Sequence, residues 1–173
     1  MSKFTHITTL PVLPDHYINE GMSANYELKF APCSYRIESS FDNSKLCREL
    51  RKEFGVCFSQ YVLFKAGSYY DWHCDIKRNF ALNWLITTTP RAISMYRSVV
   101  PTPPGSNTIQ TILYDVAEIN YTLYHPVLLN TSQMHAVVNP GPDDRIILTV
   151  SVNGVGYEQM IEWLAQHPMD TYD

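Results

Sequence analysis

Three side chains that can bind a metal stand together in the segment YYDWHCDIKRNFALNWLI, residues 69–86. His73, Cys74 and Asp75 offer an imidazole, a thiol and a carboxylate. In an extended strand, successive side chains point to opposite faces, so His73 and Asp75 share one face and Cys74 points to the other. We therefore predict that His73 and Asp75 bind a metal together and that Cys74 does not.

A third ligand is expected from His135, which begins a short strand after a polar turn in the segment LLNTSQMHAVV. Two histidines and one carboxylate, with further coordination positions left open, form a ligand set that suits non-haem Fe(II) and oxygen chemistry. The sequence thus predicts a catalytic iron site made of His73, Asp75 and His135.

Arg145 opens the segment RIILTVSV, which is otherwise uncharged and has the pattern of a buried strand. A buried guanidinium is costly unless an anion pairs with it. Thr149 and Ser151 share a strand face with Arg145 because of their even spacing, and such a face can bind a carboxylate. We expect an acidic ligand between the metal and Arg145. The alternative is a structural ion pair with Asp143 or Asp144.

The elements that must position these residues are mainly strands. From residue 56 onward, short β-branched and aromatic runs alternate with turn signals, and no helical pattern separates them. This pattern predicts a sandwich, jelly roll or barrel and argues against a parallel α/β sheet. One helix, FDNSKLCRELRKEFG, precedes the strands, and another, GYEQMIEWLAQHP, follows them. The first forty residues are expected to be irregular or to form short strands.

Length and charge narrow the classes of function. A chain of 173 residues is long enough for one domain with a buried core. A formal net charge of −4 argues against nucleic acid as a partner, because phosphate-backbone binders are normally basic. No apolar run could span a bilayer, and the N-terminus has no signal-peptide pattern. We expect a cytoplasmic protein without a membrane partner.

The order and spacing of the candidate residues resemble those of the 2-oxoglutarate/Fe(II)-dependent oxygenases. Their pattern is His-x-Asp, then a distal His, then an Arg or Lys about ten residues later. Here His73-Cys74-Asp75, His135 and Arg145 follow that order. The resemblance covers residues 58–152. It implies a mainly β protein with a double-stranded β-helix (jelly-roll) core, one flanking N-terminal helix and one C-terminal helix, in a single domain, residues 1–173.

The resemblance also implies a reaction. The enzyme would use Fe(II), O2 and 2-oxoglutarate to hydroxylate a substrate, with release of succinate and CO2. The far carboxylate of 2-oxoglutarate would pair with Arg145. Polar residues on the surrounding strands would help to bind this cosubstrate: Ser151, Thr149, Asn83 and Tyr61.

Within the superfamily, the chain looks most like small aspartyl/asparaginyl- or prolyl-hydroxylase-like members, some of them phage-encoded. This implies a peptidyl or free amino-acid substrate, and the host cytoplasm as location if the protein is phage-encoded. Arg78 and Trp84 would contact the substrate. The chain departs from the family at Ile147, where many members have Ser, and at Ser151, where the DNA-repair dealkylases have a second Arg.

Several of these assignments have structural alternatives. Asn83 and Tyr61 can be satisfied core polar groups, Arg78 a surface base, and Trp84 a core residue. For the whole protein, the alternative is a cupin-type metal-binding jelly roll that acts as an isomerase, a dioxygenase or a binding module without 2-oxoglutarate. A cupin site would need further His or Glu ligands near the first pair, and it would leave Arg145 without a role.

Overall fold

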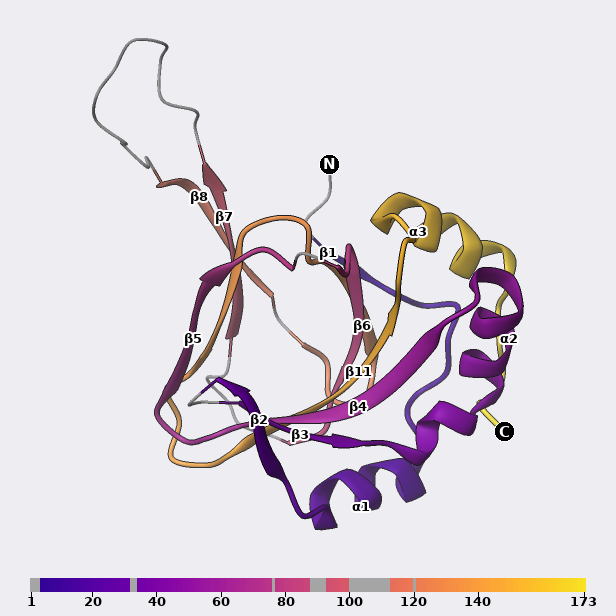
Figure 1. Ribbon diagram of the computed structural model, residues 1–173, viewed down its shortest axis with the longest axis horizontal. Coiled ribbons are helices and arrows are strands. Elements are labelled where there is room, and N and C mark those ends of the chain that lie inside the picture. Colours follow the sequence, from indigo (N-terminus) through magenta and orange to yellow (C-terminus); the bar gives the residue numbers. More distant parts are fainter. Residues whose placement is uncertain (1–3, 32–33, 76, 88–92, 100–112, 120) are drawn as a thin grey trace, which may run out of the picture.

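Two antiparallel sheets form the body of the molecule, and the described part of the chain is mainly β (Figure 1). The computed structural model describes residues 4–31, 34–75, 77–87, 93–99, 113–119 and 121–173. The helices lie outside one of the two sheets, and the other sheet faces it from the opposite side (Figure 1). The mainly β class predicted from the sequence is confirmed.

The first sheet has seven strands and the second has four among the described residues. In spatial order, the first sheet consists of β1 (Phe4–His6), β9 (Pro126–Asn130), β6 (Phe80–Leu85), β11 (Arg145–Val152), β4 (Cys57–Phe64), β3 (Ser34–Glu38) and β2 (Glu27–Ala31). The second consists of β5 (Ser68–His73), β10 (His135–Asn139), β7 (Ile93–Val99) and β8 (Leu113–Ile119). From β4 to β11 the chain passes repeatedly from one sheet to the other, which is consistent with the predicted jelly roll.

Both predicted helices are present. In α2 (Lys45–Phe54), the Ser44 hydroxyl accepts a hydrogen bond from the Cys47 N–H, and the helix ends at Gly55, whose φ of 88° is easy only for glycine. The C-terminal helix is α3 (Tyr157–Gln166). A short 3-10 helix, η1 (Ser40–Asn43), precedes α2. No helix in the described ranges is long and apolar enough to cross a membrane.

A further helix, α1 (Asp15–Ser23), lies in the region that the sequence predicted to be irregular or to form short strands. Its sequence, DHYINEGMS, gives weak local signals. Pro14 precedes the helix without a capping side chain, and Gly21 lies inside it. The helix is therefore stabilised by packing against the sheet, which sequence patterns do not reveal.

The strands of the first sheet have two different faces, because side chains alternate along a strand. On β11, Ile146, Leu148, Val150 and Val152 pack in the apolar core beneath the helices. The other face of β11 carries Arg145, Ile147, Thr149 and Ser151, and all eight residues are buried. The residues expected to do chemistry therefore face the space between the sheets, and the helix side supplies the main hydrophobic core.

We predict that Gly21→Ala destabilises the protein. An added Cβ would lie 2.8 Å from a ring carbon of Tyr61 and 2.9 Å from Ile86 Cδ1. Overpacking costs about 1–3 kcal/mol, and the better helix propensity of Ala returns less than about 1 kcal/mol. We expect a net loss of about 1 to 2 kcal/mol in the free energy of unfolding, measured by urea denaturation. Met22→Ala, at an exposed position of the same helix, is the control. Equal stability of the two variants would contradict the close packing of α1.

Candidate metal centre and adjoining pocket

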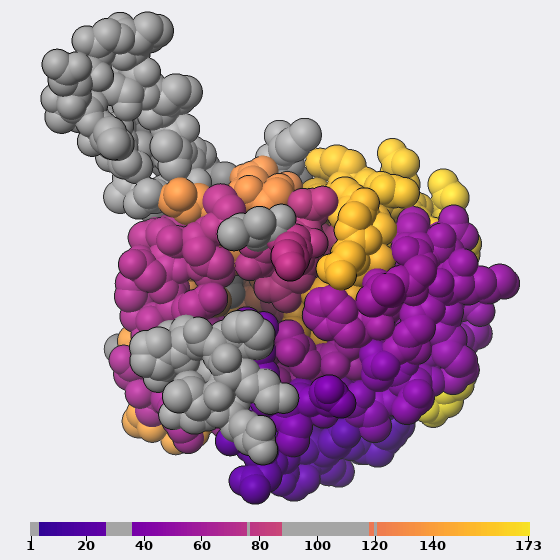
Figure 2. Space-filling view, viewed as in Figure 1, coloured from indigo at the N-terminus to yellow at the C-terminus, as the bar shows by residue number. Residues whose placement is uncertain are grey.

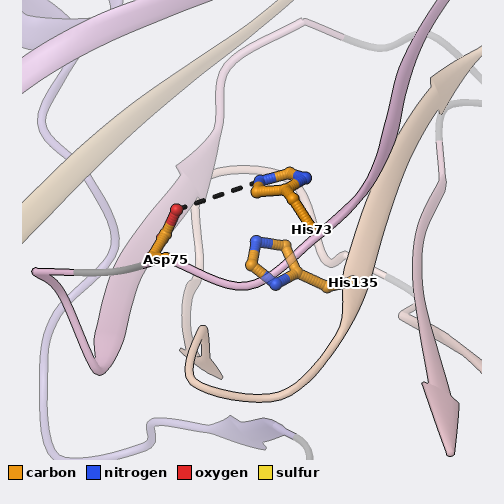
Figure 3. A group of neighbouring side chains, drawn as sticks. All are labelled: His73, Asp75 and His135. Carbon is orange, nitrogen blue, oxygen red and sulfur yellow. Dashed lines mark ion pairs between the residues drawn. The ribbon is translucent and has the colours of Figure 1, made fainter. Parts of the chain in front are cut away.

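The side chains of His73, Asp75 and His135 lie close together (Figure 3). One ligand atom from each lies within 4.8 Å of the others, so the three can hold a metal ion. His73 Nε2 is 3.9 Å from Asp75 Oδ1, and the two imidazole rings are 4.3 Å apart between centroids. The donor set of two imidazoles and one carboxylate suits a divalent metal such as Fe(II).

Strand pairing brings the two histidines together. β5 and β10 are antiparallel, and His73, the last residue of β5, is opposite His135, the first residue of β10. The sequence pattern had placed Asp75 within the strand, but in the structure it lies two residues after the end of β5. Its N–H donates to the Thr131 carbonyl at 2.9 Å, which fixes the turn that carries the carboxylate. Cys74 is exposed, and its thiol is not in the ligand group found among the described residues.

Hydrogen bonds orient both imidazoles for metal binding. The carbonyl of Asp71 lies 2.6 Å from His73 Nδ1, and the carbonyl of Gln133 lies 2.8 Å from His135 Nδ1. Because a carbonyl only accepts, each Nδ1 carries a hydrogen, and Nε2 is the nitrogen of each ring that can bind a metal. Burial lowers the pKa of His135 to about 4, against the opposing effect of the Gln133 carbonyl. His135 is therefore neutral at pH 7, the form that binds metals.

Arg78 holds the carboxylate of Asp75. Its Nε and Nη2 lie 2.8 and 2.7 Å from Asp75 Oδ2, and its Nη1 donates to Ser151 Oγ at 3.2 Å. The Thr131 hydroxyl donates to the Arg78 carbonyl at 2.8 Å. Arg78 was expected to contact the substrate, and Ser151 the cosubstrate. In the structure, these two side chains bind each other and support Asp75, whose Oδ1 is the oxygen nearer to His73.

A pocket lies between the two sheets next to the metal-binding group, and the surface is hollowed near the centre of the face shown in Figure 2. Its lining includes His73, His135 and Arg78. Apolar side chains of both sheets form much of its wall: Val62, Phe64, Ala81, Ile119, Leu129, Val137 and Ile147. Such walls exclude water from whatever the pocket binds.

Two polar side chains of the first sheet, Asn83 and Thr149, face this pocket from neighbouring positions on β6 and β11. Both are buried, and neither Asn83 Oδ1 nor Thr149 Oγ1 has a hydrogen-bond partner among the described residues. Asn83 Nδ2 donates to the Tyr121 hydroxyl at 3.5 Å. A buried polar atom left without a partner costs about 1–3 kcal/mol. Their position on the wall indicates a ligand with polar groups.

Arg145 is fully buried, with 0 % of its surface exposed. None of its three guanidinium nitrogens has a hydrogen-bond partner in the described part of the chain. The Tyr121 ring lies against it, with its centroid 4.9 Å from the guanidinium carbon. Burial lowers the pKa of Arg145, and Tyr121 opposes this effect.

The structural alternative for Arg145 was an ion pair with Asp143 or Asp144. Asp144 instead binds Lys65 Nζ at 2.8 Å and the Ala66 N–H at 2.9 Å. No ion pair of Arg145 is found within the described ranges, so among these residues no carboxylate balances its buried positive charge.

Tyr61 and Trp84 lie away from the pocket, which corrects the expectation that they bind cosubstrate and substrate. Both belong to the apolar core on the helix side of the first sheet. The Tyr61 hydroxyl is 2.8 Å from the Tyr17 carbonyl and 2.8 Å from Glu20 Oε2. Trp84 packs against Phe41, with 5.3 Å between ring centroids. The physical reason is the strand period, since their neighbours Val62 and Asn83 occupy the pocket face.

Sequence reasoning missed three residues of the pocket region. Arg36 lines the pocket from β3, opposite Val62 of β4. Tyr70 lines it from β5, with its ring centroid 4.3 Å from that of His73. Tyr121 covers Arg145. Strict alternation along β5 would put Tyr70 and His73 on opposite faces, because they are three residues apart. A register shift in the pairing of β5 with β10 brings the two rings together. The position of Arg36 depends on a long-range strand pairing, and no local pattern gives either feature.

No family model and no curated protein matches this sequence. Solved structures do match. A prolyl-4-hydroxylase from Pseudomonas putida is 10% identical, with a TM-score of 0.56, over 87% of this chain and 92% of that one. HygX from Streptomyces hygroscopicus, solved with nickel, 2-oxoglutarate and hygromycin B bound, is 11% identical, with a TM-score of 0.56, over 88% and 83% of the two chains.

A 2OG-Fe(II) oxygenase family oxidoreductase from Burkholderia pseudomallei is 10% identical, with a TM-score of 0.55, over 80% of this chain and 77% of that one. The chain shares its fold with 2-oxoglutarate/Fe(II) oxygenases. At such low identity the likeness concerns the oxygenase fold alone. Evidence for chemistry in this chain must therefore come from its own side chains.

We predict that Arg78→Gln weakens metal binding and leaves the fold intact. The variant loses the two contacts that orient Asp75, and removal of such a supporting residue typically lowers metal affinity about 10–100-fold. Titration with Fe(II) in the absence of oxygen measures the change. Lys77→Gln removes a neighbouring exposed cation and should bind iron as the parent does. Equal affinities of Arg78→Gln and the parent would show that Arg78 does not orient a ligand.

Proposed function

We propose that this protein is a 2-oxoglutarate- and Fe(II)-dependent oxygenase that hydroxylates a peptidyl or free amino-acid substrate. One observation carries the proposal. The buried guanidinium of Arg145 has no carboxylate partner among the residues that the structure describes, and it shares the pocket-facing side of β11 with Thr149. The pocket adjoins a group of two histidines and one aspartate. This arrangement suits a small dicarboxylate that reaches from the metal to Arg145.

The residues present fit the metal and the cosubstrate. His73, Asp75 and His135 would hold Fe(II) and leave further positions open. When bound, Fe(II), 2-oxoglutarate and O2 would together supply the oxidising chemistry that adds one oxygen atom to the substrate and yields succinate and CO2. Arg145 would bind the far carboxylate. Thr149 Oγ1 and Asn83 Oδ1 would form hydrogen bonds with polar atoms of the same ligand or with a water molecule bound to it.

The protein's own residues perform three tasks in this proposal. Arg78 and the Thr131 carbonyl fix the orientation of Asp75. The carbonyls of Asp71 and Gln133 keep both imidazoles in the metal-binding tautomer. The apolar pocket walls keep water away from the reacting groups.

Residues 58–152 would form a double-stranded β-helix catalytic core within a single domain, residues 1–173, of the aspartyl/asparaginyl- or prolyl-hydroxylase-like type. We also propose a cytoplasmic location, which would be the host cytoplasm if the protein is phage-encoded. The cupin-type alternative has less support. The ligand group found in the described residues has no additional His or Glu, and a site without an acidic cosubstrate would leave Arg145 without an anion.

The first test is spectroscopic. We expect the protein, mixed with Fe(II) and 2-oxoglutarate without oxygen, to show the weak visible metal-to-ligand charge-transfer band. His135→Ala should lose both the band and the bound iron because one of three ligands is gone. His125→Ala, an exposed histidine outside the ligand group, should behave as the parent does. A parent protein that binds iron but never develops the band would favour the cupin-type alternative.

Arg145→Met separates a cosubstrate role from a structural one. Met fills much of the same space and removes a buried charge, so we expect the free energy of unfolding of the metal-free protein to stay equal or to rise by about 1 kcal/mol or more. Affinity for 2-oxoglutarate, measured from the charge-transfer band, should fall about 100-fold, as expected for a lost charge-assisted pair worth about 3 kcal/mol. A large loss of stability with unchanged affinity would instead identify Arg145 as part of a structural ion pair.

A further inference from the structure

The metal-binding group lies where two hollows meet. The pocket described above extends between the sheets, and a more open cleft, here called the outer cleft, adjoins it. Four residues line both: Arg36, Tyr70, His73 and Arg78. Asp75 lines the outer cleft, together with Gln60, Cys74 and Lys77. In the proposed function the inner pocket holds 2-oxoglutarate, so the outer cleft is the place from which a substrate reaches the metal.

Arg36 and Tyr70 reach this junction from opposite sheets. Arg36 pairs with Val62 in the antiparallel ladder of β3 and β4, and directly opposed residues project to the same face. Since Val62 lines the inner pocket, Arg36 also projects between the sheets. Tyr70 belongs to β5 in the second sheet, and its ring packs against His73. A guanidinium and a phenol hydroxyl are thus brought next to a candidate metal ligand.

Basic residues outnumber acidic ones among the described residues that line the outer cleft. Arg36, Lys77 and Arg78 line it, with Asp75 as the acidic residue among the described lining residues. Arg78 and Asp75 are already bound to each other.

The surroundings of Arg36 disfavour its positive charge. Burial lowers its pKa most, the neighbouring charge of Arg78 lowers it further, and Tyr70 and Asp75 oppose the shift.

We propose that Arg36 and the Tyr70 hydroxyl bind a carboxylate of the substrate, so that the outer cleft selects a free amino acid or a peptide with an accessible carboxylate. This inference rests on the proposed function and narrows its substrate class. The planar fork of a guanidinium matches a carboxylate with two parallel hydrogen bonds, and a phenol can donate a third. Binding at this junction would hold the rest of the substrate beside the metal.

The test uses the full chain loaded with Fe(II) and 2-oxoglutarate without oxygen. The probes are free L-amino acids and short acidic peptides, each paired with its carboxamide. Perturbation of the charge-transfer band reports binding, and succinate formed after oxygen is admitted reports turnover. We expect carboxylates to bind about tenfold or more tightly than their amides, and Arg36→Gln to lose that preference. Arg36→Lys should retain part of it. Lys52→Gln, which removes an exposed cation of α2 that lines neither hollow, should retain all of it.

The outcomes separate this inference from the function on which it rests. A parent protein without the charge-transfer band refutes the proposed function, and the inference fails with it. If the band forms but Arg36→Gln weakens the binding of 2-oxoglutarate itself, Arg36 serves the cosubstrate and the inference is wrong. It is equally wrong if acids and amides bind alike, if no carboxylate of the panel perturbs the band, or if Arg36→Gln binds them as the parent does.

Discussion

The alternation of side chains along β11 is the constraint on which the rest of this molecule depends. β11 lies in the interior of the first sheet, between β6 and β4, and all its residues are buried. One face is apolar and packs beneath the three α-helices. The other carries Arg145, Thr149 and Ser151 toward the second sheet. A shift of one residue in its pairing would move the charged side chain into the hydrophobic core, so the register of this strand is strongly specified.

The metal end of the pocket is built from residues distant in sequence but joined by short hydrogen bonds. The pairing of β5 with β10 sets His73 opposite His135. The turn after β5 is fixed on Thr131, and Arg78 connects Asp75 to Ser151 of the first sheet. The ligand group is thus tied to both sheets, and such support keeps ligand geometry defined without depending on a single loop.

Much of this arrangement was predictable from the sequence. Local patterns predicted the pair His73 and Asp75 and the later His135, and the structure brings these three together. The even spacing from Arg145 to Ser151 predicted a shared strand face, which the structure also has. The alternation of side chains also explains why Tyr61 and Trp84 were wrongly expected in the pocket. Their residue types suit binding, but their positions on β4 and β6 turn them to the helix side of the sheet. Helix α1 and the placement of Arg36 were missed for another reason. Both depend on contacts between segments far apart in the chain, which propensity and periodicity do not contain.

The guanidinium of Arg145, which lacks a counterion among the described residues, has a consequence for the protein as a whole. Burying a charge without a counterion lowers the free energy of unfolding of a protein. An anion that binds only the folded chain raises it again. With the proposed dicarboxylate as that anion, the population of folded molecules would depend on its concentration. If the proposed cosubstrate binds there, folding and occupancy of the pocket would be linked equilibria, and the supply of that metabolite would act on the lifetime of the protein.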